Sequence, residues 1–200
     1  MIPVTNPIQE PPDFDVECRQ LGNDWLAAHP AAKPKSFPSH WIKFEAELEN
    51  GFGCRCGWWA VRIDSGTVDH FFSKAKPANR GLVYEWSNYR HSAATLNSSK
   101  KNLDDQVLDP FEIQADWFEV LLPSMLVVRT GQVPQHLQIK ADFTLDRLKI
   151  NGVNAKCRRI RKRYYDDYKT GKLTPAGLRD YAPLIAEAVR RMEANHQPLP

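Results

Sequence analysis

Cysteine and methionine are scarce in this sequence, and its net charge is low. The chain of 200 residues has four cysteines and three methionines, and its formal net charge is +3. Cys18, Cys54, Cys56 and Cys157 are scattered apart from one close pair, which is unlike the dense disulfide framework of a small secreted domain. We therefore expect reduced thiols in a cytoplasmic protein. The small net charge does not by itself indicate a nucleic-acid partner.

Long apolar runs are also missing. The longest candidate surrounds Val120 to Leu122, far short of the roughly 20 apolar residues that a helix needs to cross a bilayer. Residues 1–13 contain four prolines and lack the basic and apolar segments of a secretory signal. This stretch is predicted to be an extended arm, and neither a membrane span nor a membrane partner is expected.

The hydrophobic content and the spacing of apolar residues indicate an α+β fold. Hydrophobic residues make up 42% of the chain, which is enough for a sizeable core. Apolar residues at helical spacing predict one helix from about 14 to 28 and a second from about 40 to 48. The expected buried stripe of the first helix consists of Val16, Leu21, Trp25 and Leu26.

The central region is predicted to combine two strands with a helix. Aromatic and β-branched residues on both sides of Ser65-Gly66 predict a β-hairpin over about 53–71, whose second strand carries Asp69 and His70. A basic loop follows at 73–81. A helix is then predicted from about Ser92 to Leu103.

The remainder is predicted to be mainly helical. Residues 117–123 and 125–130 have the character of two short strands joined around Pro123-Ser124. From Asp142 onward helices are predicted to start near Leu145, to run from Ile160 to Tyr168, and to run from Leu178 to Met192. These patterns divide the chain into N-terminal helices at 1–51, a central unit at 52–112 and an accessory region at 113–200.

Four residues between Val68 and Asn97 suit metal-dependent hydrolysis of phosphodiester bonds. Asp69 and Asn97 offer oxygen ligands to a divalent ion, and a neutral His70 can take a proton from water at cellular pH. Successive side chains on a strand point to opposite sides, so Asp69 and His70 share one site only where the strand twists or ends. Asn88 is expected either to hold the imidazole or to tie the loop to the strand.

At these positions the chain resembles the His-Asn-His (HNH) endonucleases, the ββα-metal nucleases. The matching features are VDHF at 68–71 followed by Lys74, YEWSN at 84–88, and LNSSKKN at 96–102. The resemblance implies that Asp69 and Asn97 bind Mg²⁺ or a similar ion such as Mn²⁺. It also implies that His70 is the general base, that Asn88 supports the catalytic loop, and that residues 52–112 form the nuclease core.

A weaker resemblance extends through VLDPF at 107–111, a phrase shared with antiviral defence members of that family that pair with an ATPase. The chain departs from many relatives in one respect. Those carry two Cys-x-x-Cys pairs that hold a structural zinc, whereas here the first pair is Cys54 and Cys56, and Ala93 and Leu96 stand at the second. Because tetrahedral zinc normally takes four ligands, a structural zinc is not expected, and apolar packing by Trp58, Trp59 and Leu96 is predicted instead.

Basic residues surround the predicted site. Lys74, Lys76, Lys100 and Lys101 are predicted substrate contacts, since each neutralised phosphate adds affinity. DNA is the expected substrate in preference to RNA. A denser cluster at 156–163 has charges on nearly all sides, which fits nucleic acid, a partner protein or a solvated helix.

Other functions remain open on the sequence alone. His70 is also compatible with a strand histidine bonded to Asp69, and Asn97 with a helix cap. One alternative function is a catalytically silent nucleic-acid-binding module. Another is a nuclease subunit of a defence complex that works only with an ATPase. The sequence leaves the metal, the number of strands cut, the target preference and the oligomeric state undecided.

Overall fold

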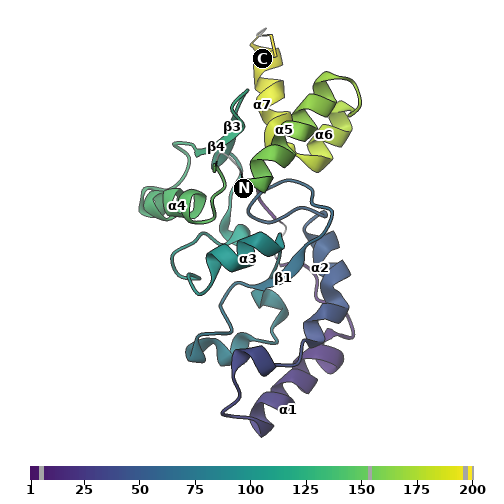
Figure 1. Ribbon diagram of the computed structural model, residues 1–200, viewed down its shortest axis with the longest axis vertical. Helices are drawn as coiled ribbons and strands as arrows, with labels where there is room; N and C mark the ends of the chain where they lie inside the picture. Colours follow the sequence, from purple (N-terminus) through teal and green to yellow (C-terminus); the bar gives the residue numbers. More distant parts are fainter. Residues whose placement is uncertain (5–6, 153–154, 196–197, 200) are drawn as a thin grey trace.

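A computed structural model describes residues 1–4, 7–152, 155–195 and 198–199, with the side chains of Asn97 and Ser98 excepted. The molecule is elongated, with the first helices at one end, the last helices at the other, and the strands and α3 between them (Figure 1). It combines helices with two small antiparallel sheets. The predicted α+β class is thereby confirmed.

Both predicted N-terminal helices are present. A π-helical segment, Asp15–Gln20, continues into α1, Leu21–Ala28, and a 3₁₀ segment, His40–Phe44, continues into α2, Glu45–Gly51. The predicted stripe of the first helix is wrong in part, because Val16 is 61% exposed and Leu21 is 48% exposed. The buried face instead follows positions four residues apart, namely Phe14, Cys18, Gly22 and Leu26.

Gly22 explains why this face is the buried one. A Cβ added there would lie 2.3 Å from the ring of Tyr84, closer than any side chain tolerates. The glycine therefore lets α1 approach the loop that contains Tyr84, and this loop also forms part of the predicted site.

The strand that carries Asp69 and His70 pairs differently from the prediction. β1, Thr67–His70, pairs antiparallel with β2, Tyr89–Ser92, and Asp69 faces Arg90 while His70 faces Tyr89 in the register. The predicted partner strand before Ser65-Gly66 is wrong. Residues 54–63 instead turn back on themselves and are joined by a single bridge.

The local backbone accounts for this difference. Cys54 and Ala60 adopt positive φ angles of 56° and 54°, which break an extended strand. Trp58 and Trp59 are both buried, whereas consecutive residues of a one-sided strand alternate between core and solvent. After β2 the chain enters α3, Ala94–Lys100, so strand, long loop, strand and helix follow one another around the predicted site.

The predicted second pair of strands is confirmed. β3, Phe118–Leu121, and β4, Leu126–Arg129, pair antiparallel around Pro123-Ser124. The helices that follow are α4, Gln135–Arg147, α5, Lys156–Lys169, α6, Pro175–Tyr181, and α7, Pro183–Ala194.

Two of these helices differ from their predicted bounds. α4 begins at Gln135, well before the predicted start near Leu145. The predicted last helix from Leu178 to Met192 is divided at Ala182. Pro183 explains the division, because proline disfavours a helical conformation in the preceding residue and cannot donate a helical hydrogen bond.

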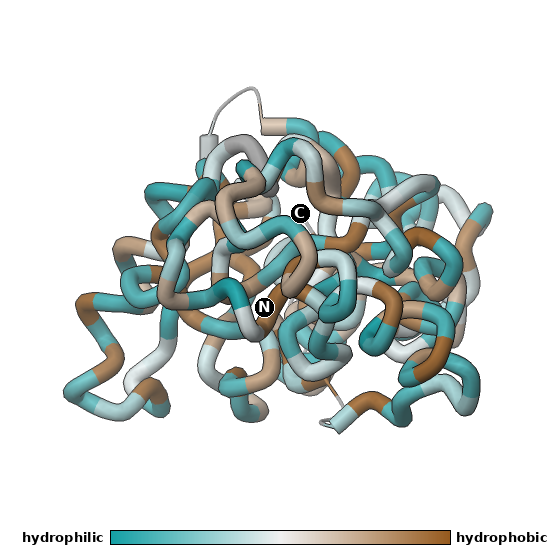
Figure 2. The backbone as a smooth tube through the Cα atoms, turned by 90° about the horizontal axis from the view of Figure 1, so that it is seen from below, coloured by the Kyte–Doolittle hydropathy of each residue, from teal (hydrophilic) through white to brown (hydrophobic). Residues whose placement is uncertain are grey.

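The described apolar residues form two clusters. One joins the buried turn at 56–63 to β3, β4 and the C-terminal helices. The other joins the N-terminal helices to the segment 83–89. Apolar and polar stretches alternate at short intervals along the backbone (Figure 2). The predicted domain boundaries at 51/52 and 112/113 stay a prediction.

Candidate active site

Asp69 and His70 are the last two residues of β1, and both are buried. Asp69 is 5% exposed and His70 is 8% exposed. The two side chains leave the strand on opposite sides, as alternation requires. His70 packs against rings of Trp41 and Tyr89, whereas Asp69 faces α3 through Lys100. The end of β1 therefore supplies an acid and a base from adjacent residues.

A backbone carbonyl fixes the imidazole of His70. Nε2 lies 3.0 Å from the carbonyl oxygen of Val83, which also accepts a hydrogen bond from the hydroxyl of Tyr89. A carbonyl oxygen only accepts, so Nε2 carries the ring proton and Nδ1 keeps its lone pair in the neutral imidazole. Trp41 and Tyr89 pack edge to face with this ring at 4.6 and 5.1 Å.

Burial keeps this histidine neutral. It lowers the pKa of His70 to about 3, and the nearby ammonium of Lys74 acts in the same direction. Lys74 lies over the ring of Trp41 at 4.5 Å, and burial lowers its pKa as well. The imidazole is therefore unprotonated at neutral pH and Nδ1 has a free lone pair, although a pKa this far below neutrality makes it a weaker base than an ordinary histidine.

Asp69 forms an ion pair with a buried lysine. Nζ of Lys100 lies 3.0 Å from Oδ2 of Asp69 and donates a hydrogen bond of 2.9 Å to the backbone oxygen of His70. Oδ2 itself has no well-aligned hydrogen bond, so the contact with the ammonium is chiefly one of charge. Burial raises the pKa of Asp69 to about 6, although Lys100 opposes this rise.

Asn88 ties the long loop between β1 and β2 at both ends. Its Oδ1 accepts a hydrogen bond of 2.7 Å from the backbone of Phe72, and its Nδ2 donates to the carbonyl oxygens of Phe72 and Leu82 at 3.1 and 2.9 Å. Of the two predicted roles, the structure contains the tie between loop and strand. The tie holds the loop that carries Val83, and Val83 in turn fixes His70.

Asn97 belongs to α3, three residues before Lys100. Its side chain lies outside the described residues, so its assignment as a metal ligand stays a prediction. The described part of the chain contains no group of three or more His, Cys, Asp or Glu side chains placed to share an ion. The residues nevertheless suit a hard cation in one respect, since Oδ2 of Asp69 is a buried oxygen without a hydrogen bond and already attracts an ammonium.

The four lysines predicted to contact substrate have different surroundings. Lys100 is buried, 1% exposed, whereas direct contact with a substrate requires access from solvent. Lys76 is half-buried and forms ion pairs with Asp104 and Asp105 at 3.1 and 3.2 Å. Lys74 lies against Trp41, and Lys101 is exposed at the end of α3. Substrate contact by these residues stays a prediction.

A second buried ion pair lies beside the site and was not predicted from the sequence. Arg90 on β2 donates two hydrogen bonds to the carboxylate of Asp109, at 2.6 and 2.5 Å, and stacks over Phe111 at 3.8 Å. This pair holds VLDPF at 107–111 against β2. The phrase was recognised in the sequence, but nothing there indicated its partner.

The predicted apolar packing beside Cys54 and Cys56 is confirmed. Trp58, Trp59, Ala93 and Leu96 are buried in the same cluster as Cys56. All four cysteines of the chain are free thiols. The space between the buried turn and α3 is therefore filled by side chains of the protein.

Comparison with models of protein families, with curated proteins and with solved structures gave no match. Among the described residues, no helix has both the length and the apolar character needed to cross a membrane.

Proposed function

We propose that this protein is a metal-dependent endonuclease that hydrolyses DNA phosphodiester bonds at the end of β1. One observation carries the proposal. The imidazole of His70 is neutral, and the carbonyl of Val83 leaves its Nδ1 as a proton acceptor, while the buried carboxylate of the adjacent residue Asp69 lies on the other side of the same strand end. A base and a cation-attracting acid at one strand end are the residue types that phosphodiester hydrolysis needs.

Each residue then has a separate task. His70 takes a proton from water at Nδ1. Asp69 and Asn97 hold a divalent ion, which when bound neutralises charge on the phosphate and the departing oxygen. Asn88 keeps the loop in place, and through Val83 it keeps the imidazole oriented.

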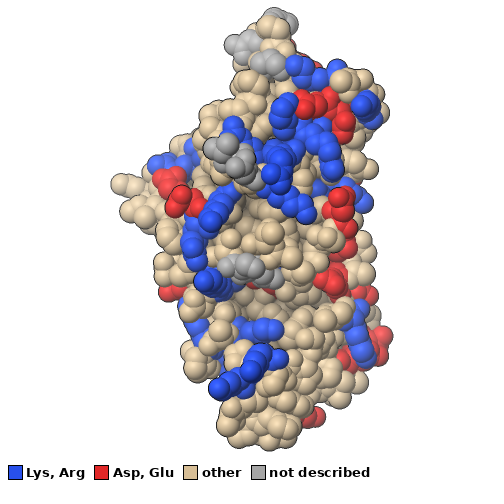
Figure 3. Space-filling model, in the orientation of Figure 1, with Lys and Arg blue, Asp and Glu red and all other residues tan. Residues whose placement is uncertain are grey.

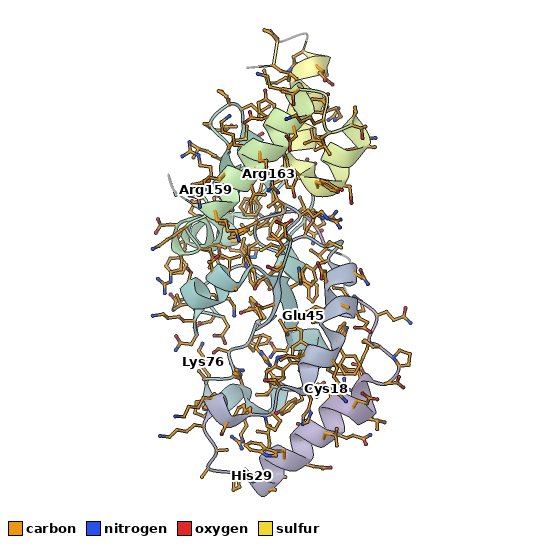
Figure 4. All side chains as sticks on the ribbon, turned by 45° about the vertical axis from the view of Figure 1, so that its right-hand side comes forward. Cys18, His29, Glu45, Lys76, Arg159 and Arg163 are labelled. Carbon is orange, nitrogen blue, oxygen red and sulfur yellow. The ribbon has the colours of Figure 1, made fainter. Side chains whose placement is uncertain are left out.

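The charge distribution supports a polyanionic substrate. Lys and Arg side chains gather over α5 and continue along the left-hand side of the face seen in Figure 3. Arg159 and Arg163 lie on successive turns of α5 (Figure 4). Exposed cations of this density provide the contacts by which proteins hold the phosphate backbone.

Not all of the α5 cluster is available to a substrate. Arg158 donates to the carbonyl of Ser124 at 2.9 Å. Arg161 is fully buried and donates to the carbonyls of Met125 and Ile150. The exposed members are Lys156, Arg159, Lys162 and Arg163, of which Lys162 forms an ion pair with Asp166 at 2.8 Å.

The test is cleavage of a supercoiled plasmid in Mg²⁺ or Mn²⁺ by wild type and by His70→Ala and Asp69→Asn. Loss of cleavage in both variants supports the proposal. Cleavage that persists in both variants refutes this site.

The Lys100–Asp69 ion pair favours a second candidate, a nucleic-acid-binding module without catalysis. An ammonium already neutralises the carboxylate there, so a divalent ion is not needed for the fold. DNA binding without cleavage, under all metal conditions and with native folding, identifies this module. Cleavage that appears only with a co-purified ATPase identifies the defence-complex subunit suggested by VLDPF.

A further inference from the structure

Lys100 lies against the carboxylate of Asp69, and its surroundings are unusual for a lysine. Its side chain is 1% exposed, and its ammonium contacts Oδ2 of Asp69 and the backbone oxygen of His70. The ring of Phe71 lies 5.4 Å from Nζ. Lysine is almost never fully buried without a partner, so Asp69 and this carbonyl account for its position.

We propose that Lys100 is a built-in competitor for the divalent ion. Its ammonium occupies the cation position at Asp69 in the resting protein, and metal binding requires it to leave. The inference rests on the proposed function, because it concerns the same carboxylate.

Geometry and charge make the two occupants mutually exclusive. A magnesium ion binds carboxylate oxygen at about 2.1 Å and needs near-octahedral space around it, whereas Nζ of Lys100 lies 3.0 Å from that oxygen. Two cations on one buried oxygen also repel each other strongly. The lysine side chain is long and flexible enough to swing away without a change in the backbone.

The location of Lys100 suits a second role for its ammonium after a metal ion displaces it from Asp69. It is the last residue of α3, directly before Lys101, whose φ of 50° ends the helix. In the proposal, the displaced ammonium swings toward the solvent that reaches the neighbouring Lys101 and there meets the phosphate that the metal binds. Lys100 thus acts as a resting-state cation and, after displacement, as a positioning residue for the substrate.

Metal affinity tests this directly, without any measurement of activity. Mn²⁺ binding is followed by electron paramagnetic resonance for wild type, Lys100→Met and Lys101→Met. Lys101→Met is the matched control, because it removes one charge from the neighbouring exposed residue. Lys100→Met is expected to bind Mn²⁺ roughly tenfold more tightly or better, with Lys101→Met close to wild type. Equal affinity for wild type and Lys100→Met, or equal gains in both variants, overturns the proposal.

A second measurement uses the wild type alone and does not depend on the folding of a variant. The ¹⁵N signal of the Lys100 ammonium, assigned by its loss in Lys100→Arg, reports the ion pair. Addition of Mg²⁺ is expected to shift this signal or to abolish it through exchange with water. A signal that stays unchanged at Mg²⁺ concentrations that saturate the site overturns the proposal.

The two proposals fail in different ways. Tighter Mn²⁺ binding by Lys100→Met in a protein that never cleaves DNA supports the competitor and refutes the nuclease. Metal-dependent cleavage by wild type, with the same Mn²⁺ affinity in Lys100→Met, supports the nuclease and refutes the competitor.

Discussion

The imidazole of His70 and the carbonyl of Val83 lie 3.0 Å apart, and this contact sets the tautomer of the candidate base. Val83 belongs to the loop that Asn88 closes, so the orientation of the base depends on a residue 18 positions further along the chain than His70. Catalytic competence at this site is therefore linked to the integrity of the loop.

Replacing Asn88 by alanine is expected to destabilise the protein. The change leaves the backbone groups of Phe72 and Leu82 without their partner, which should lower the free energy of unfolding by roughly 2 to 4 kcal/mol. Urea unfolding measures this. Asn102→Ala, at an exposed position, is the control, and an equal loss in both variants contradicts the role of Asn88.

Removing one member of the Arg90–Asp109 pair should lower the free energy of unfolding more than expected from replacing both members by apolar residues. Asp109→Ala leaves a buried guanidinium uncompensated, and such losses amount to about 3–5 kcal/mol. The double variant Arg90→Met/Asp109→Leu is expected to lose less than the sum of the two single variants. A double-mutant cycle by urea unfolding measures the interaction energy between the two residues. Strictly additive losses of unfolding free energy argue against such an interaction.

Much of the helical framework could be predicted because it depends on local apolar spacing, as in the segments beginning at Phe14 and His40. The partner of β1 could not be predicted in the same way. The buried aromatics at 58–59 have strong strand propensity, yet positive φ angles at Cys54 and Ala60 turn the chain there. Strand pairing across the loop 71–88 depends on long-range contacts, such as Asn88, that no local pattern records.

Three of the predicted site residues lie around one loop, whereas the charged groups that lie beside them were not predicted. Asp69, His70 and Asn88 were identified from their types and spacing, and the structure places them around one loop. Lys100 was predicted only as a substrate contact, and the sequence did not indicate that it is buried. Its burial follows from a partner 31 residues earlier in the chain, and Arg90 likewise depends on Asp109.

Acid should destabilise the protein partly through His70. Its folded pKa of about 3 lies below the unfolded value of 6.5, so the unfolded state binds more protons between these values. The free energy of unfolding should therefore fall as pH decreases from about 6.5 toward 3, by at most about 1.4 kcal/mol per pH unit from this group.

The carboxyl of Asp69 acts in the opposite direction. Its folded pKa of about 6 lies above the unfolded value of 3.8, so its contribution to stability is lost as pH rises through 6. Unfolding of His70→Gln between pH 4 and 7 isolates the histidine, and the slope of its unfolding free energy against pH should be more negative than that of wild type, by up to about 1.4 kcal/mol per pH unit. Identical slopes contradict a buried neutral His70.

Charge reversal on α5 should weaken nucleic-acid binding. Arg159→Glu/Arg163→Glu removes two exposed cations, which should lower DNA affinity and reduce the dependence of log affinity on log salt by about 1 for each lost phosphate contact. Fluorescence anisotropy measures both. The control Lys172→Glu/Arg179→Glu changes two exposed residues elsewhere in the C-terminal region, and an equal effect there contradicts a specific role for α5.

The most direct test of the account is the rate of plasmid cleavage by wild type and His70→Ala in Mg²⁺ or Mn²⁺, with the exposed His136→Ala as control and EDTA as the metal-free condition. Cleavage is expected for wild type and His136→Ala and not in EDTA, and the rate for His70→Ala is expected to be about 10²- to 10⁴-fold lower, the range for loss of a general base. Cleavage by His70→Ala at the wild-type rate would contradict the account.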